Sequence, residues 1–133
     1  MTSYKEHKKI KSAIAPMLMA ADFDLVLFEH KRCDVTALAK VGNKRFVLGV
    51  EVERSARNVV ENVMRNITAG CDHELVVCSN QKVMRQVLKK LREHLSESSL
   101  KKISITTWDK LSVEDLRRIK DQISQTATET NNC

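Results

Sequence analysis

Apolar residues alternate with other residues most regularly between positions 46 and 53. One set of alternate positions is entirely apolar: Phe46, Leu48, Val50 and Val52. The positions between them hold Val47, Gly49, Glu51 and Glu53. Because successive side chains of a strand point to opposite faces, this alternation predicts a strand over 46–53 with one apolar face. Other apolar runs predict strands over 25–28, 34–41, 74–78 and 101–108, with a hairpin turn at Gly42-Asn43-Lys44.

Four segments instead show the three- and four-residue spacing of apolar positions that is typical of helices. The predicted helices cover residues 4–20, 58–69, 81–95 and 113–124. A meander of three strands that continues into strand–helix–strand crossovers requires a mixed sheet with helical cover. We therefore expect an α/β fold whose mixed central β-sheet is flanked by helices on both faces. A single domain would span 1–124, followed by a polar, flexible C-terminal tail over 125–133.

The length, charge and cysteine spacing of the chain limit the kinds of protein that it could be. The chain has 133 residues, and 23 Lys and Arg against 17 Asp and Glu give a formal net charge of +6. No apolar run approaches the ~20 residues of a membrane span, and no signal-peptide core follows the lysine-rich N-terminus. We expect a cytoplasmic protein without a membrane partner. The spacing of the four cysteines, at 33, 71, 78 and 133, fits neither a zinc site nor a disulfide framework, which favours free thiols.

The candidate chemistry lies on the non-apolar face of the 46–53 strand. Glu51 and Glu53 share that face, and the preceding hairpin allows Asp34 to lie beside them. Carboxylates on a covered sheet are costly unless a positive charge compensates them, and close carboxylates raise each other's pKa. A hard divalent cation with oxygen ligands would relieve this repulsion.

These residues, in this order of elements, resemble the PD-(D/E)xK nuclease superfamily, which has the restriction-endonuclease-like fold with an αβββαβ core. The resemblance covers about residues 4–95. Asp34 stands at the motif aspartate, Glu51 at the (D/E) position, and Glu53 where lysine is usual. Glu6 matches the acidic residue that some members carry in the first helix. The resemblance implies that Asp34, Glu51 and the backbone carbonyl of Val52 bind Mg²⁺ or Mn²⁺, with Glu53 as general base or second metal ligand.

The activity implied by this resemblance is metal-dependent hydrolysis of phosphodiester bonds in DNA. Arg54, Arg57 and Asn58, just beyond the strand, would contact the nucleic acid. The segment that follows, residues 54–66, is similar to nuclease domains of mobile elements. A defence system is a second context in which such a nuclease would act. A homodimer, or a larger nucleic-acid-processing complex, would supply two active centres for cutting two strands.

Two other interpretations remain open. The first is a catalytically inactive nuclease-fold domain used for nucleic-acid binding or assembly. Its basis is the net positive charge and the basic residues of the 81–95 helix, because phosphate neutralisation gives salt-sensitive affinity. The second is a protein-interaction module in which Glu51 and Glu53 are solvated on a strand. Neither metal binding nor nucleic-acid binding would be expected in that case.

Overall fold

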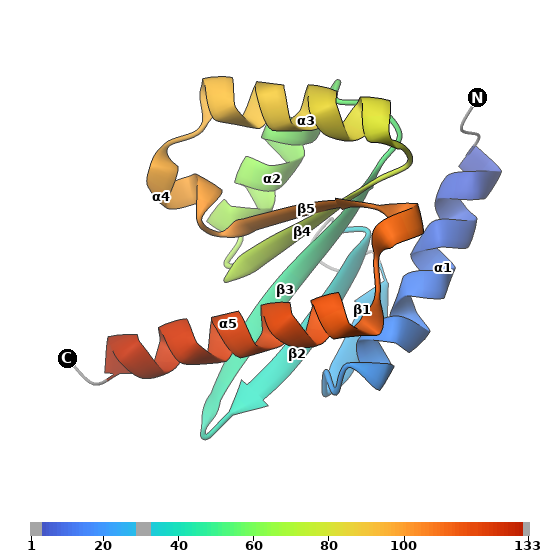
Figure 1. Ribbon diagram of the computed structural model, residues 1–133. Helices are drawn as coiled ribbons and strands as arrows, with labels where there is room; N and C mark the ends of the chain where they lie inside the picture. The colour runs from blue at the N-terminus through green and yellow to red at the C-terminus, as the bar shows by residue number, and fades with distance from the viewer. Residues whose placement is uncertain (1–3, 29–32, 132–133) are drawn as a thin grey trace.

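Five strands form one mixed β-sheet, in the spatial order β1-β2-β3-β4-β5, in the computed structural model (Figure 1). It describes residues 4–28 and 33–131, with side chains over 6–28 and 33–125. The strands are β1 (Leu25–Phe28), β2 (Val35–Val41), β3 (Lys44–Glu53), β4 (His73–Cys78) and β5 (Ile103–Thr107). The helices are α1 (Tyr4–Ala20), α2 (Val59–Thr68), α3 (Gln81–His94), α4 (Glu97–Leu100), the 3-10 helix η2 (Trp108–Lys110) and α5 (Val113–Asn131).

The sheet changes from antiparallel to parallel at its central strand, β3. β1, β2 and β3 are antiparallel neighbours, whereas β3, β4 and β5 run parallel. The turn between β2 and β3 is tight, since Val41 pairs with Lys44. Gly42 adopts a φ of +61° there, a conformation that glycine enters without steric cost. Residues 48–50 of β3 are thus paired with strands on both sides, and the buried side chains within residues 48–53 face the helical layers.

Helices cover both faces of this sheet. α1 and α5 lie on one face and α2 and α3 on the other (Figure 1). The core beneath α1 and α5 is apolar and includes Ile14, Leu18, Val35, Leu48, Val50, Val52 and Leu116. A second apolar cluster, beneath α2 and α3, includes Val59, Val63, Val76, Cys78, Val87 and Leu91. No helix within the described ranges is long and apolar enough to cross a membrane.

The predicted fold class is confirmed, as is the order of helix, three strands, helix and strand at the start of the chain. The two predicted faces of β3 are confirmed as well, because Leu48, Val50 and Val52 pack in the core beneath α1 and α5. The short helix α4 was not predicted; its N-cap residue is Ser96, whose Oγ accepts the N–H of Ser99 at 3.2 Å.

Several predicted boundaries differ from those of the structure: the strand predicted over 101–108 is Ile103–Thr107, for example, and Trp108 begins the 3-10 helix η2. Two other differences concern the candidate site and the end of the domain. The second strand begins at Val35 rather than at Asp34, which lies in a bend before it. The last helix does not end at 124 but continues to Asn131, so most of the predicted tail is helical. The helix can continue through residues 125–131 because no glycine or proline interrupts them.

Candidate functional site

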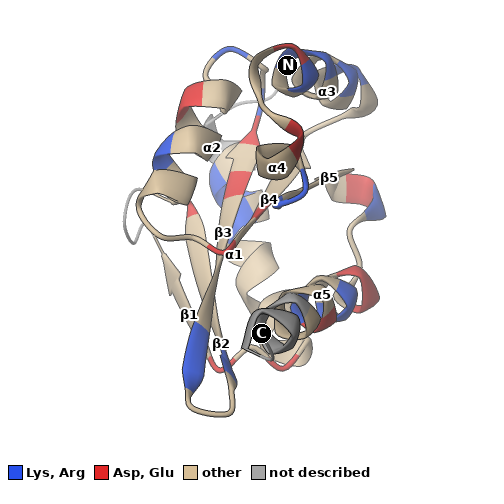
Figure 2. Ribbon diagram, turned by 90° about the vertical axis from the view of Figure 1, so that its left-hand side faces the viewer, with Lys and Arg blue, Asp and Glu red and all other residues tan. Residues whose placement is uncertain are grey.

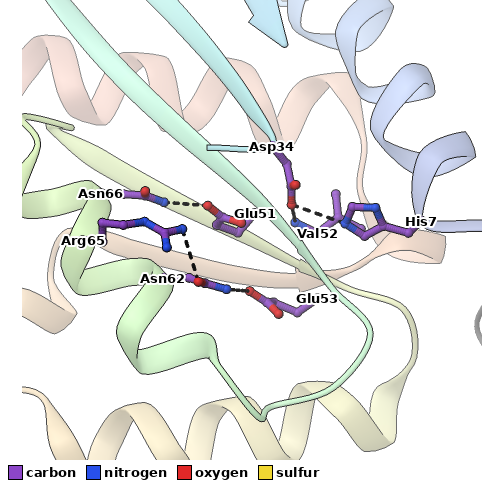
Figure 3. A network of polar contacts seen from close by, with 8 residues as sticks. All are labelled: His7, Asp34, Glu51, Val52, Glu53, Asn62, Arg65 and Asn66. Atoms are coloured by element: carbon purple, nitrogen blue, oxygen red, sulfur yellow. Dashed lines mark hydrogen bonds and ion pairs between the residues drawn. The ribbon is translucent and has the colours of Figure 1, made fainter. Parts of the chain in front are cut away.

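Asp34 lies beyond the last residue pair of β2 and β3, which joins Val35 to Val50. Its Oδ2 atom accepts the backbone N–H of Val52 at 2.8 Å (Figure 3). The same oxygen lies 3.4 Å from Nε2 of His7, on α1. The side chain is therefore positioned by the central strand and by the first helix together. This arrangement sets the carboxyl group against the end of β3 that carries the other candidate acids.

Glu51 is almost fully buried, with 4% of its surface exposed. Its Oε1 atom accepts a hydrogen bond from Nδ2 of Asn66, on α2, at 2.8 Å (Figure 3). Burial, together with the nearby negative charge of Asp34, raises the pKa of Glu51 to about 9, although the Asn66 hydrogen bond opposes the shift. Without a bound cation, the neutral form of Glu51 therefore predominates at pH 7.

Glu53 lies next along the same face of β3 and is 8% exposed. Nδ2 of Asn62 donates to its Oε1 at 3.1 Å, and Arg65 donates in turn to Oδ1 of Asn62 at 3.2 Å. Burial raises the pKa of Glu53, whereas the Asn62 hydrogen bond and the charges of Arg54 and Arg65 lower it. The predicted acids Asp34, Glu51 and Glu53 are thus brought together, and an Arg–Asn pair of α2 lies over one of them.

The predicted nucleic-acid contacts lie in the 54–58 loop, which connects β3 to α2. Arg54, Arg57 and Asn58 are all exposed there, at the same end of β3 as the acids. The Nζ atom of Lys90, on α3, donates to the carbonyls of Ala56 at 3.1 Å and Arg57 at 2.9 Å. One basic side chain therefore holds the backbone of the loop while the two arginines extend from it. Lys and Arg residues also lie on α3, as its blue segments in Figure 2 show.

The first helix contributes to the site through a residue that the sequence analysis did not select. Glu6 is on the exposed side of α1, whereas its neighbour His7 is partly buried and reaches Asp34. The role of Glu6 as a site residue stays a prediction. His7 had no local signal in the sequence, because its position depends on how α1 packs across the sheet.

Three further residues, Asn62, Arg65 and Asn66, were also not selected as site residues. They come from one side of α2, next to its buried residues Val59 and Val63, and a search for polar residues at spacings of three and four would have found them. The asparagine side chains supply the hydrogen bonds that the buried acids need in this environment. Their presence distinguishes this part of α2 from an ordinary solvated helix face.

The oxygen atoms at this end of β3 are of the type that fits Mg²⁺ or Mn²⁺. Asp34 is near enough to Glu51 for its negative charge to raise the pKa of Glu51, and each acid uses one oxygen in the contacts described above. The carbonyl of Val52 points to the Asp34 side of β3, since the N–H and C=O of one strand residue point to the same side and this N–H donates to Asp34. Within the described residues, no group of three or more His, Cys, Asp and Glu side chains has metal-binding geometry.

A fourth acid, Glu74, is buried behind this site on β4. It is fully buried, and neither of its carboxyl oxygens has a hydrogen-bond partner among the described residues. Burial raises the pKa of Glu74 to about 8. Gly49, its partner on β3, makes room for this side chain, because a Cβ atom there would collide with Oε2 of Glu74. The non-apolar face of β3 thus encloses a neutral carboxyl group as well as the three candidate acids.

Comparison with known proteins adds no family assignment: no family model, curated protein or solved structure matches the chain.

Proposed function

We propose that this protein is a metal-dependent nuclease that hydrolyses phosphodiester bonds of DNA. The observation that carries the proposal is the meeting of Asp34 and Glu51 at the end of β3, beside the backbone carbonyl of Val52. Both acids are held in place by other elements: Asp34 by the N–H of Val52 and by His7, and Glu51 by Asn66. Burial of the Glu51 carboxyl group costs free energy, whereas an apolar side chain at this position would stabilise the covered strand. The carboxyl group is therefore best explained by a role in binding a ligand.

Each residue has a distinct role in the proposed reaction. Asp34, Glu51 and the Val52 carbonyl hold one Mg²⁺ or Mn²⁺ ion. Such an ion supplies Lewis-acid stabilisation of the negative charge on the scissile phosphate. Glu53 accepts the proton of the attacking water, a role that suits a carboxylate whose pKa burial has raised. The water oxygen bonds to phosphorus as the phosphorus–oxygen bond to the leaving strand breaks.

Positive charge for the phosphate comes from α2 and from the 54–58 loop. Arg65 takes the place in this proposal that the usual lysine of the motif would have, because Asn62 links it to Glu53. Arg54 and Arg57 hold the phosphates on either side of the scissile bond. Lys90 positions the loop and does not itself contact the substrate. A homodimer would place two such sites on a duplex.

Cleavage assays with matched variants test the proposal. Labelled single-stranded, duplex and branched DNA would be incubated with Mg²⁺ or Mn²⁺ and with wild type, Glu51→Gln or Glu114→Gln. Glu114 is an exposed glutamate of α5, on the opposite face of the sheet, so its variant controls for the loss of one charge. We expect cation-dependent cleavage by wild type and Glu114→Gln, and a loss of at least about a hundredfold in Glu51→Gln. Equal cleavage by all three proteins, or none with any substrate, would contradict the proposal.

A second candidate function is DNA binding without catalysis. It is favoured by Glu53 in place of lysine and by the Lys90-supported loop, whose basic side chains do not depend on the acids. This function predicts salt-sensitive DNA binding that Glu51→Gln leaves intact, with no cleavage by any of the proteins. Binding and cleavage measured on the same samples therefore separate the two functions.

A further inference from the structure

Two buried thiols face each other on the same face of the sheet as the candidate acids. The Sγ atoms of Cys33 and Cys71 are 3.9 Å apart, although 38 positions separate the residues in the sequence. Their side chains are 1% and 5% exposed, and both cysteines are reduced in the structure. The spacing of the cysteines in the sequence gave no indication of this pair.

The pair forms because segments on the two sides of β3 approach each other across that strand. Cys33 directly precedes Asp34, which is held to β3 through the N–H of Val52. Cys71 lies in the turn before β4, where the N–H of Asp72 donates to the carbonyl of Val47 at 2.9 Å. Gly49 lies beneath the second thiol, since a Cβ atom there would be 3.0 Å from Sγ of Cys71. The absent side chain of Gly49 thus leaves the space in which the sulfur lies.

We propose that Cys33 and Cys71 are an oxidation site, which a peroxide or a low-molecular-weight disulfide converts to an intramolecular disulfide. With hydrogen peroxide, one thiol is first oxidised to a sulfenic acid and one water is released. The second sulfur then displaces the hydroxyl group, the sulfur–sulfur bond forms, and a second water leaves. The thiols together lose two electrons and two protons, and the peroxide is reduced. This site does not depend on the proposed nuclease activity.

The required movement is small. A disulfide has a sulfur–sulfur distance of about 2.0 Å, so the two atoms must approach by roughly 2 Å, within the reach of side-chain rotation and a slight backbone shift. The bond would tie the segment that carries Asp34 to the turn that leads into β4. Because both thiols are buried, small oxidants will reach them more readily than bulky thiol reagents.

Cys78 provides an internal contrast. It is also buried, but it packs in the apolar cluster beneath α2 and α3 with Val63, Val76 and Val87. Its surroundings are those of a small hydrophobic side chain rather than of a reactive pair. A chain that retains Cys71 and Cys78 is therefore a matched control for one that retains Cys33 and Cys71.

The test uses the full chain with Cys133→Ser in every variant, which removes the C-terminal thiol. One variant adds Cys78→Ala and keeps the proposed pair, and the control adds Cys33→Ala. Each folded protein is treated with hydrogen peroxide, or with oxidised glutathione, and its mass, free thiols and tryptic peptides are measured. Wild type is treated in parallel. Its tryptic peptide 66–82 contains both Cys71 and Cys78, so fragmentation of this peptide in the mass spectrometer identifies which of the two is linked.

We expect the Cys78→Ala variant to form no disulfide between chains, to lose two hydrogen atoms and both free thiols, and to yield peptide 33–40 joined to peptide 66–82. The control should form no intramolecular disulfide. The wild-type chain should show the same Cys33–Cys71 link, which keeps the test decisive if a variant folds poorly. Thiols that stay free, become oxidised singly, or join only different chains in folded wild type would overturn the proposal.

Discussion

The two faces of β3 are both buried, yet they are built from opposite kinds of side chain. Toward α1 and α5 the strand presents Leu48, Val50 and Val52, which lie in one apolar core. Toward α2 it presents Gly49, Glu51 and Glu53, which have Glu74, Asn66 and Asn62 as polar neighbours. Burial of each large apolar side chain stabilises a fold by roughly 1.5–3 kcal/mol, whereas burial of a carboxylate costs free energy. The first face therefore accounts for stability, and the second is better explained by function.

The largest expected effect on stability is that of a substitution on the apolar face of β3, and a substitution on the acidic face provides the comparison. Leu48→Ala should lower the free energy of unfolding by about 2–5 kcal/mol, because it leaves a cavity in the core. Glu51→Gln, which keeps the shape of the side chain and removes its ability to ionise, should leave that free energy unchanged or raise it. Urea denaturation at pH 7 measures both. A Glu51→Gln variant as unstable as Leu48→Ala would assign both faces of β3 to stability alone.

The pH dependence of stability should carry the signature of the acidic face. An unfolded chain loses the Glu74 proton around the ordinary pKa of 4.5, whereas burial in the folded protein raises the pKa to about 8. Between these values the unfolded chain binds fewer protons, so stability falls as pH rises. Glu51, with a pKa of about 9, extends the fall to higher pH. We expect the midpoint of thermal unfolding to decrease from pH 6 to pH 9.

Glu74→Gln should flatten part of this decrease, because the amide has no proton to lose in that range. Glu114→Gln, a change at an exposed site, should reproduce the wild-type profile. Calorimetry or circular dichroism at several pH values distinguishes these outcomes. A wild-type midpoint that rises between pH 6 and pH 9 would mean that the acids gain charge-stabilising contacts that the structure does not contain.

A smaller effect is expected at Gly49, where the acidic face admits no side chain. In Gly49→Ala the new Cβ atom would meet Glu74 and the sulfur of Cys71. We expect a loss of about 1–3 kcal/mol in the free energy of unfolding, as is typical of overpacked cores. The loss should shrink in a Glu74→Ala background, because the main obstacle is then absent. Equal losses in the two backgrounds would show that Glu74 does not occupy the space beside Gly49.

The smallest effect on stability is expected at the edge of the acidic face. Lys90→Met removes the two hydrogen bonds from α3 to the 54–58 loop and should cost about 1 kcal/mol or less, because the loop is exposed. Under the proposed function, DNA affinity should fall severalfold, because Arg54 and Arg57 lose their supported backbone. Lys82→Met, an exposed change on the same helix, is the control for net charge. Indistinguishable affinities of the two variants would leave Lys90 without a positioning role.

The sequence predicted the apolar face of β3 more completely than the acidic face. Strict alternation over 46–53 identified the strand and assigned Leu48 and Glu51 to opposite faces, since side-chain direction in a strand follows directly from parity. The hairpin likewise allowed Asp34 to lie beside Glu51 or Glu53, and in the structure the charge of Asp34 acts on both. These are local relationships, which a single chain segment and its turn determine.

The supporting residues of the site could not be predicted in the same way. His7 reaches Asp34 only because α1 crosses the sheet, and Lys90 reaches the 54–58 loop only because α3 packs beside α2. The contact between Cys33 and Cys71 depends on two segments that approach across β3. Such contacts arise from how distant elements pack, and no periodicity in the sequence encodes them. The end of α5 was missed for another reason, because polar residues can continue a helix that has already begun.

The central claim is that the acidic face of β3 binds a divalent cation, and direct measurement of that binding tests it best. Manganese can be titrated into wild type, Asp34→Asn and Glu114→Gln while free Mn²⁺ is followed by electron paramagnetic resonance. The account predicts that wild type and Glu114→Gln bind one Mn²⁺ per chain, that Mg²⁺ competes for this site, and that Asp34→Asn loses it. Unchanged binding in Asp34→Asn, or no binding by folded wild type, would contradict the account.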